Sequence, residues 1–228
     1  MPKDSCLPAH PQSSATLVKA FTMAKKKPQT VDSVPTVDSP DGKPVLAFST
    51  PAVFDRWLSK HHGEHGGVWI QFFKKDSGYK SVTYAQALDV ALCYGWIDGP
   101  VRKGNDVSWI HKFTPRGKRS VWSQVNKVHI ERLTREGLMK PAGLAVVELA
   151  KADGRWDAAY ASSSTFEESA EFLEALGKSE QASKFYATLT KANRYAFYYR
   201  LHNAKKPETK ARKIIEFIAM LERGETFH

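Results

Sequence analysis

The hydrophobic positions change their spacing near the middle of the chain. Strand-like alternation and aromatic content occur in "GVWIQFFKK" (67–75) and "VSWIHKFTP" (107–115), and "WIDGPV" (96–101) has the length of a short strand and turn. Beyond Pro115, apolar residues recur at helical spacing almost to the C-terminus. The pattern predicts an α+β fold: a small α/β N-terminal portion with a few strands, followed by a mainly helical C-terminal half.

Capping signals set the expected helix bounds. Ser49 or Thr50 precedes Pro51, which is the arrangement of an N-cap followed by proline at the first helical position. Thr83 and Gln86 have the spacing of a capping box ahead of a helix that ends at Gly95. Later helices are expected from Ser120 to Gly137, from Pro141 to Gly154, from Thr165 to Gly177, from Ser179 to His202, and from Pro207 to Gly224. The third of these begins with a capping box of Thr165 and Glu168. The last is expected to bury Ile214, Ile215, Phe217, Ile218 and Leu221.

The first 45 residues read as a disordered tail, because Pro, Ser, Thr, Asp and Lys dominate them without a period that would bury a face. Residues 46–228 are expected to form one compact domain, with an α/β portion at about 46–115 and a helical portion at about 116–228. The basic stretch "ATLVKAFTMAKKK" leaves open an organelle-targeting role for the tail, and Met23 leaves open a second start site.

Composition favours a globular protein, since 42% of the 228 residues are hydrophobic. The two cysteines, Cys6 and Cys93, are too few for a disulfide framework, and no run of about 18 apolar residues could span a membrane. We therefore expect a cytoplasmic protein. The net charge of +10 favours contact with polyanions or acidic small molecules, although basic charge can also serve solubility alone.

The segment "ALCYGWIDGPVRKG" (91–104) combines a helix end with a carboxylate between Ile97 and Gly99. Asp98 can bind turn amides, or it can line a site as a ligand-binding carboxylate or general acid/base. Cys93 is expected in the core, because the C-terminal end of a helix disfavours the thiolate that a nucleophile needs.

A second candidate region is "KFTPRGKRSVWSQVN" (112–126), in which three cations precede a serine that could begin a helix. Between residues 100 and 135 there are nine Lys or Arg against two acids. Free N–H groups at a helix start and adjacent cations favour an anion, whereas the alternative is an ordinary cap with a solvated rim. The predicted ligand site comprises Trp96, Asp98, Arg116, Lys118, Ser120, Trp122, Ser123 and Asn126.

Other motifs carry weaker indications. His61, His62 and His65 lack the spacing of metal ligands, so neither a metal nor another cofactor is expected. His111 is a candidate proton carrier beside the anion site.

The C-terminal basic region is a further candidate surface. From Lys184 to Lys213 there are nine basic residues and one acid, with Tyr195 and Tyr198 among them. This mixture is compatible with nucleic-acid binding, but the helical spacing of the aromatics favours core packing.

Five segments together resemble the YdeI/OmpD-associated (OmdA-like) bacteriocin-protection family, over about residue 48 to the C-terminus. They are "GVWIQFFKK", "SVTYAQALDVALCYGWIDG", "FTPRGKRSVWSQVN", "GLMKPAGLAVVELAKADGRWD" and "NAKKPETKARKIIEFIAMLERGE". Positions that match the family's signature are Lys74, Lys75, Tyr84, Cys93, Trp96, Asp98, Arg116, Ser120, Trp122, Ser123 and Asn126. The resemblance implies a stress or protection protein without assigning residue roles. The expected function is small-anion binding near Asp98 and Arg116, with an Asp98 acid/base enzyme and a nucleic-acid-binding protein as alternatives.

Overall fold

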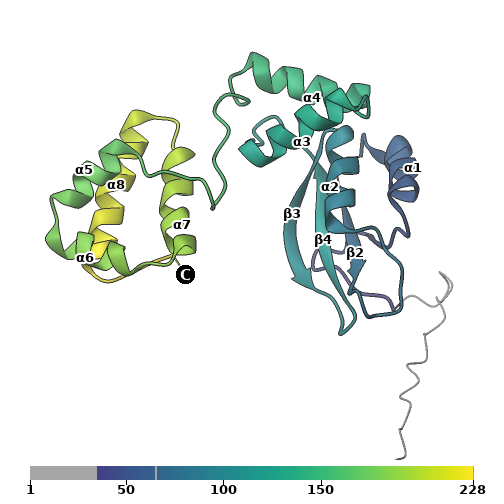
Figure 1. Ribbon diagram of the computed structural model, residues 1–228, viewed down its shortest axis with the longest axis horizontal. Helices are drawn as coiled ribbons and strands as arrows, with labels where there is room; N and C mark the ends of the chain where they lie inside the picture. The colour runs from purple at the N-terminus through teal and green to yellow at the C-terminus, as the bar shows by residue number, and fades with distance from the viewer. Residues whose placement is uncertain (1–34, 65, 228) are drawn as a thin grey trace, which may run out of the picture.

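The computed structural model describes residues 35–64 and 66–227, and the predicted targeting segment and Met23 lie outside them. Two bodies are visible in Figure 1. We call residues 45–152 the sheet lobe, residues 170–222 the helical lobe, and residues 153–169 the connector. The α+β class is confirmed, because one four-stranded sheet lies in the N-terminal half and helices make up the C-terminal half.

The sheet has the strand order β1-β2-β4-β3. β1 (Val45–Leu46) runs parallel to β2 (Val68–Phe73), which pairs antiparallel with β4 (Ser108–Pro115). β4 in turn pairs antiparallel with β3 (Trp96–Lys103), with a register shift between Asp98 and Val101. The three predicted strands are confirmed, and every residue of β2 is buried.

Four helices belong to the sheet lobe: α1 (Pro51–His61), α2 (Tyr84–Cys93), α3 (Gln124–Arg135) and α4 (Pro141–Ala152). The Thr50 cap and the Thr83–Gln86 capping box are confirmed. These helices share one core with the sheet, in which Phe54, Trp96 and Trp122 are almost fully buried.

The helical lobe contains α5 (Ala170–Gly177), α6 (Glu180–Thr188), α7 (Lys191–His202) and α8 (Pro207–Glu222). Its core is separate and centres on Phe172, Phe197 and Phe217. The division between cores therefore falls in the connector and not near residue 115, because α3 and α4 pack with the strands and α2.

Three local expectations in this lobe were wrong. Ser169, and not Thr165, caps α5, because Ser162 accepts the Thr165 backbone N–H in a preceding turn. The expected helix from Ser179 to His202 is broken at Leu189, and Thr190 caps a new helix. Ile215 is 72% exposed, so it lies outside the buried face of α8.

Part of the expected tail contacts the sheet. The Trp69 indole donates to Asp41 at 2.8 Å, Lys112 pairs with the same carboxylate, and the Gln71 amide donates to the Pro35 carbonyl at 2.9 Å. Lys112 and Trp69 hold the pKa of Asp41 well below its usual range. Residues 35–44 are therefore bound to the sheet lobe.

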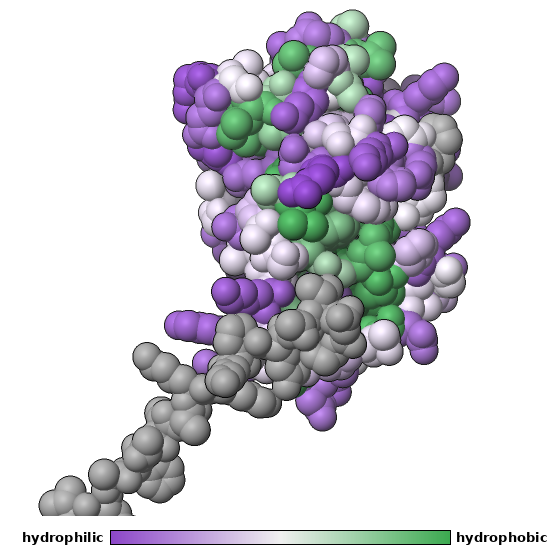
Figure 2. Space-filling view, turned by 90° about the vertical axis from the view of Figure 1, so that its right-hand side faces the viewer, coloured by the Kyte–Doolittle hydropathy of each residue, from purple (hydrophilic) through white to green (hydrophobic). Residues whose placement is uncertain are grey.

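The surface seen from the α1 side mixes hydrophobic patches with many hydrophilic side chains (Figure 2). Within the described part of the chain, no helix is long and apolar enough to cross a membrane. The cytoplasmic location stays a prediction.

Candidate functional site

Asp98 lies on β3 opposite Phe113 of β4, on the face of the sheet that carries the core. Its Oδ2 accepts a hydrogen bond of 2.9 Å from the Tyr84 hydroxyl and lies 3.6 Å from His111 Nε2. His111 Nε2 is also 2.9 Å from the Gly99 carbonyl oxygen, which can only accept, so this nitrogen carries the proton. Asp98 thus faces two donors, while its own side chain remains 26% exposed.

The two donors are held rigidly against each other. The Tyr84 and His111 rings are stacked with centroids 5.1 Å apart and planes 3° from parallel. Burial, followed by the Asp98 charge, raises the pKa of Tyr84 far above its usual value. The phenol therefore stays protonated and remains a hydrogen-bond donor to Asp98.

Arg116 follows the last residue of β4, and its backbone N–H donates to the Gly95 carbonyl at 3.0 Å. Its side chain turns into the protein, where it is only 8% exposed. Nη1 donates to the Val121 carbonyl at 3.0 Å, and the guanidinium carbon lies 3.7 Å from the centre of the Trp122 ring. Nε and Nη2 have no hydrogen-bond partner among the described residues.

The charge of Arg116 is poorly compensated. Burial lowers its pKa to about 10, and the nearby Tyr160 and Asp98 act in the opposite direction. The guanidinium therefore remains charged at neutral pH in a desolvated position. Such a cation is costly unless acceptors or an opposite charge approach it.

Tyr160 completes the arrangement from the connector. Its backbone N–H donates to the Trp122 carbonyl at 2.9 Å, and its carbonyl accepts the Gln124 N–H at 2.8 Å. Burial and Tyr199 raise its pKa, while a hydrogen bond with Ser123 and the charge of Arg116 lower it. Tyr160 is not among the predicted site residues, because a lone tyrosine in an aperiodic stretch gives no signal of this long-range bridge.

We refer to these residues as the Asp98–Arg116 cluster. Its members are Tyr84, Asp98, His111, Arg116, Ser123 and Tyr160, from α2, β3, β4, the start of α3 and the connector.

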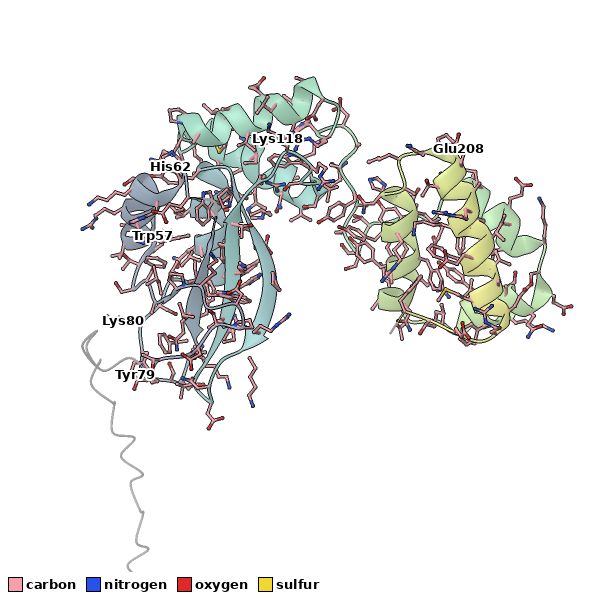
Figure 3. The ribbon with its side chains drawn as sticks, turned by 180° about the vertical axis from the view of Figure 1, so that it is seen from behind. Trp57, His62, Tyr79, Lys80, Lys118 and Glu208 are labelled. Carbon is pink, nitrogen blue, oxygen red and sulfur yellow. The ribbon has the colours of Figure 1, made fainter. Side chains whose placement is uncertain are left out.

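The predicted cap of the third helix was wrong. Ser123, and not Ser120, accepts the N–H of the third helical residue, Asn126, at 3.1 Å. Ser120 instead closes a turn by accepting the Gly117 N–H at 2.9 Å, so residues 117–122 precede the helix. Lys118 is exposed on this turn, near the helices of the sheet lobe in Figure 3.

The two predicted tryptophans lie in the core. Trp96 is 1% exposed and donates its indole N–H to the His62 carbonyl at 2.9 Å. Trp122 packs edge-on against Trp156 with ring centroids 4.9 Å apart, and its indole nitrogen has no partner among the described residues. Trp122 contacts the cluster through the ring face on which Arg116 stacks and through its backbone carbonyl, which accepts the Tyr160 N–H.

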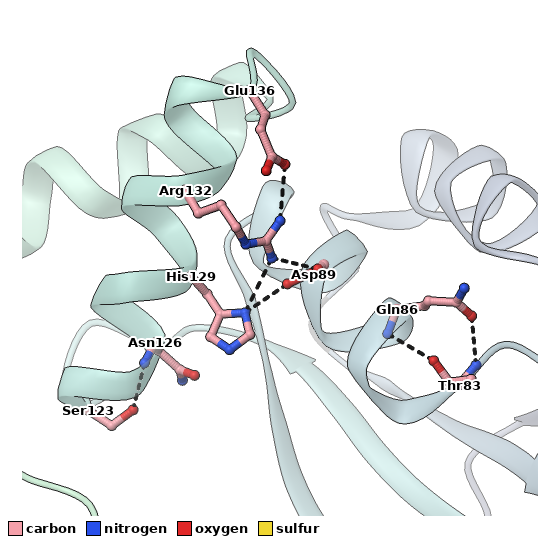
Figure 4. A network of polar contacts seen from close by, with 8 residues as sticks. All are labelled: Thr83, Gln86, Asp89, Ser123, Asn126, His129, Arg132 and Glu136. Atoms are coloured by element: carbon pink, nitrogen blue, oxygen red, sulfur yellow. Dashed lines mark hydrogen bonds and ion pairs between the residues drawn. The ribbon is translucent and has the colours of Figure 1, made fainter.

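A polar network fixes the helix that supplies Ser123 (Figure 4). Asp89 of α2 pairs with Arg132 at 2.6 Å and with His129 at 2.8 Å, both on α3, and Arg132 also pairs with Glu136 at 3.0 Å. The network joins the two helices at a half-buried position, and so positions the start of α3 relative to α2.

Cys93 is buried beside this network, at a cavity of about 310 Å³ whose walls include Val90 and Leu133. Burial raises the pKa of its thiol to about 11, with smaller contributions from charged neighbours. The neutral thiol is therefore a core group at neutral pH.

The histidines considered as metal ligands have other contacts. His61 pairs with Glu64 at 2.6 Å, and His62 Nδ1 lies 3.1 Å from the Leu58 carbonyl oxygen. Within the described ranges, no group of three or more His, Cys, Asp or Glu side chains is placed to hold a metal ion. The third histidine, His65, is not among the described residues.

Two family models match separate parts of the chain. Residues 46–146 match the Domain of unknown function (DUF8412), and residues 165–224 match the family described as Bacteriocin-protection, YdeI or OmpD-Associated. No curated protein and no solved structure matches the chain. The resemblance to the YdeI/OmdA family is confirmed over residues 165–224, which include the helical lobe, and not over the whole span from residue 48. Residues 46–146, which hold most of the Asp98–Arg116 cluster, match the other model.

Proposed function

We propose that this YdeI/OmdA-like protein binds a small anion through Arg116, with the Asp98–Arg116 cluster as its site. The observation that carries the proposal is the buried Arg116 guanidinium, whose Nε and Nη2 groups lack acceptors among the described residues. These two N–H groups belong to the same edge of the guanidinium. A carboxylate or phosphate can accept from both at once, in the bidentate arrangement that arginine favours.

The neighbouring groups narrow the class of ligand. Asp98 repels a second negative charge but can accept a further hydrogen bond, and the Tyr160 hydroxyl can donate or accept. A ligand with one acidic group and a hydroxyl or amino substituent fits this combination. Of the predicted site residues, Arg116, Asp98 and Ser123 belong to the proposed site. Trp122 contributes the ring on which the Arg116 guanidinium stacks.

The test compares Arg116→Met with Arg119→Met, which removes the same charge from an exposed position three residues away. Melting temperatures of the full chain are measured with a panel of monocarboxylates, hydroxy acids, amino acids and phosphate. We expect at least one compound to raise the melting temperature of the wild type and of Arg119→Met. An equal rise in Arg116→Met would show that this side chain does not hold the anion.

A second candidate function is acid/base catalysis by Asp98. It is favoured by the Tyr84 hydroxyl at 2.9 Å and His111 Nε2 at 3.6 Å, which could relay a proton to or from the carboxylate. Asp98→Asn preserves the shape of the site and removes the base. A compound that still stabilises Asp98→Asn, but is converted only by the wild type, would establish this activity; a compound left unchanged by both would exclude it for that ligand.

The family description, which names bacteriocin protection, also supports a protective role. In this proposal the helical lobe performs the protective role, and that role depends on anion binding in the sheet lobe. Survival of cells under antimicrobial stress, compared between wild type and Arg116→Met, tests the link. Equal survival would separate the anion site from protection.

A further inference from the structure

A second concentration of unpaired charge lies in the helical lobe, where the end of α7 meets the start of α8. The groove there has a volume of about 400 Å³. Arg200, Lys205, Lys206 and Lys213 line it together with Asn203 and Thr209, and no Asp or Glu is among its lining residues. The groove therefore gathers four positive charges without a compensating acid in its wall.

These four cations form no ion pair with any described residue, whereas Lys210 on the same helix pairs with Glu171 at 3.1 Å. Lys205 and Lys206 are exposed in the turn between the helices. Arg200 is more constrained, because Nη1 donates to the Ala196 carbonyl at 3.0 Å and the guanidinium carbon lies 3.8 Å from the centre of the Phe227 ring. The groove thus combines the constrained Arg200 with two exposed lysines and the half-buried Lys213.

Neutral groups of the groove also suit an anion. The Thr209 hydroxyl lines the first turn of α8, whose N-cap residue Lys206 provides no side-chain cap. The positive end of the helix dipole adds to the charge of the lysines at this position. Glu208 of this turn lies outside the groove lining and is labelled at the start of the helix in Figure 3.

We propose that this groove binds an oligophosphate, either free or as the phosphate tail of a nucleotide. Four cations match the charge of a di- or triphosphate, and lysine and arginine are the side chains that bind phosphate oxygens. The volume is within the range of small-ligand sites. Tyr199 is the one aromatic residue in the lining and packs edge-on against Tyr160 at 5.0 Å, so the lining provides no row of rings on which successive bases could stack. This favours a compact ligand over an extended single strand.

The test titrates the full chain with inorganic tripolyphosphate, ATP, AMP and a 20-nucleotide single strand by calorimetry at about 0.15 M salt. We expect tripolyphosphate and ATP to bind, and AMP to bind at least tenfold more weakly. Similar affinities for tripolyphosphate and ATP would mean that the groove contacts only the phosphates. A preference for ATP would mean that the ligand is a nucleotide, bound through its phosphate tail. Binding of the oligonucleotide alone, or of none of the four, would overturn the proposal.

The groove variant is Lys206→Gln/Lys213→Gln, and its matched control is Lys178→Gln/Lys184→Gln. Lys178 and Lys184 are exposed lysines of the same lobe outside the groove, so both variants remove two positive charges. We expect the groove variant to weaken tripolyphosphate binding at least tenfold, and the control to change it less than threefold. Equal weakening of tripolyphosphate binding in the two variants would mean that only the net charge of the protein matters, and it would overturn the proposed site.

The groove shares no lining residue with the site proposed around Arg116, and one further variant distinguishes the two. Arg116→Met leaves all four groove cations in place, so tripolyphosphate binding should be unchanged. Loss of that binding in Arg116→Met, with no loss in the groove variant, would show that the oligophosphate binds in the sheet lobe and not in the groove.

Discussion

The Arg116 guanidinium and the Trp122 indole are stacked in the interior of the sheet lobe, with the guanidinium carbon 3.7 Å from the ring centre. The stack positions a cation without neutralising it, because Nε and Nη2 of Arg116 find no acceptor among the described residues. A stacked aromatic ring stabilises a desolvated cation by about 1–2 kcal/mol. Removing the cation from water costs several kcal/mol, which is more than the ring restores. The ligand-free protein therefore carries an unfavourable energy at this position.

Removing the charge should relieve that cost. We expect Arg116→Met to unfold with a free energy equal to that of the wild type or up to about 2 kcal/mol above it, measured by urea denaturation without ligand. Arg119→Met, on the exposed turn, should change the value by less than about 0.5 kcal/mol. A loss of more than about 2 kcal/mol in Arg116→Met would mean that the hydrogen bond to Val121 and the packing on Trp122 dominate.

The hydrogen bond between Tyr84 and Asp98 should appear as an interaction energy. In a double-mutant cycle with Tyr84→Phe and Asp98→Ala, we expect a coupling of about 1–2 kcal/mol, because one partner is a carboxylate in a half-buried position. Urea denaturation of the four proteins gives this number. Strictly additive losses would contradict the bond and weaken the proton-relay role of Tyr84.

The raised pKa of Cys93 predicts a slow thiol reaction with a defined pH dependence. In a Cys6→Ser background, the rate of alkylation of the folded protein should keep rising until the pH passes about 11, whereas urea-unfolded protein should level off near 9. At pH 8 the folded thiolate fraction is then roughly a hundredfold lower than in the unfolded chain. A folded-state rate that levels off below pH 9 would refute the neutral core thiol.

The same shift has a consequence for stability. Because the folded pKa is raised, folding favours the protonated thiol, and the contribution is complete below the unfolded value of about 9. It is lost as the pH rises from 9 through 11. Cys93→Ala should therefore show a smaller fall in unfolding free energy over this range than the wild type, and an identical pH profile would contradict the linkage.

Much of the sheet lobe could be predicted from local patterns. The capping box at Thr83 and the alternation in 107–115 depend only on neighbouring residues, so both could be predicted from the sequence. The structure confirms the helix and the strand that they predict. The start of α3 was misplaced by three residues, because two serines, Ser120 and Ser123, can each cap a helix. Which of them does so depends on the bridge between Ser123 and Tyr160, a contact that no local pattern encodes.

The candidate site was predictable in part for the same reason. Asp98 and Arg116 stood out because a carboxylate between turn residues and a cation near a helix start are local signals. The burial of Arg116 and the approach of Tyr160 are tertiary facts, so the sequence left a solvated basic rim open as an alternative where the structure has a desolvated guanidinium.

The close approach of α4 to the end of α2 gives a final prediction, at Gly143. A Cβ atom at this position would lie 2.2 Å from the Cys93 carbonyl oxygen and 2.8 Å from its carbonyl carbon, both backbone atoms that cannot rotate away. The same carbonyl oxygen accepts the Lys140 N–H at 3.0 Å, so a shift of α4 would also strain that bond. We expect Gly143→Ala to lower the unfolding free energy by about 2–3 kcal/mol, as overpacking of a core contact does.

The matched control is Gly177→Ala, at the last position of α5, where an added Cβ would meet nothing within 4 Å. Alanine favours the helix over glycine, so this variant should be neutral or up to about 1 kcal/mol more stable. Urea denaturation of both variants separates the steric clash from the general effect of replacing glycine. If Gly143→Ala were as stable as its control, α4 would have to move off α2 at little cost, and the core that α2, α3 and α4 share would be less rigid than the packing indicates.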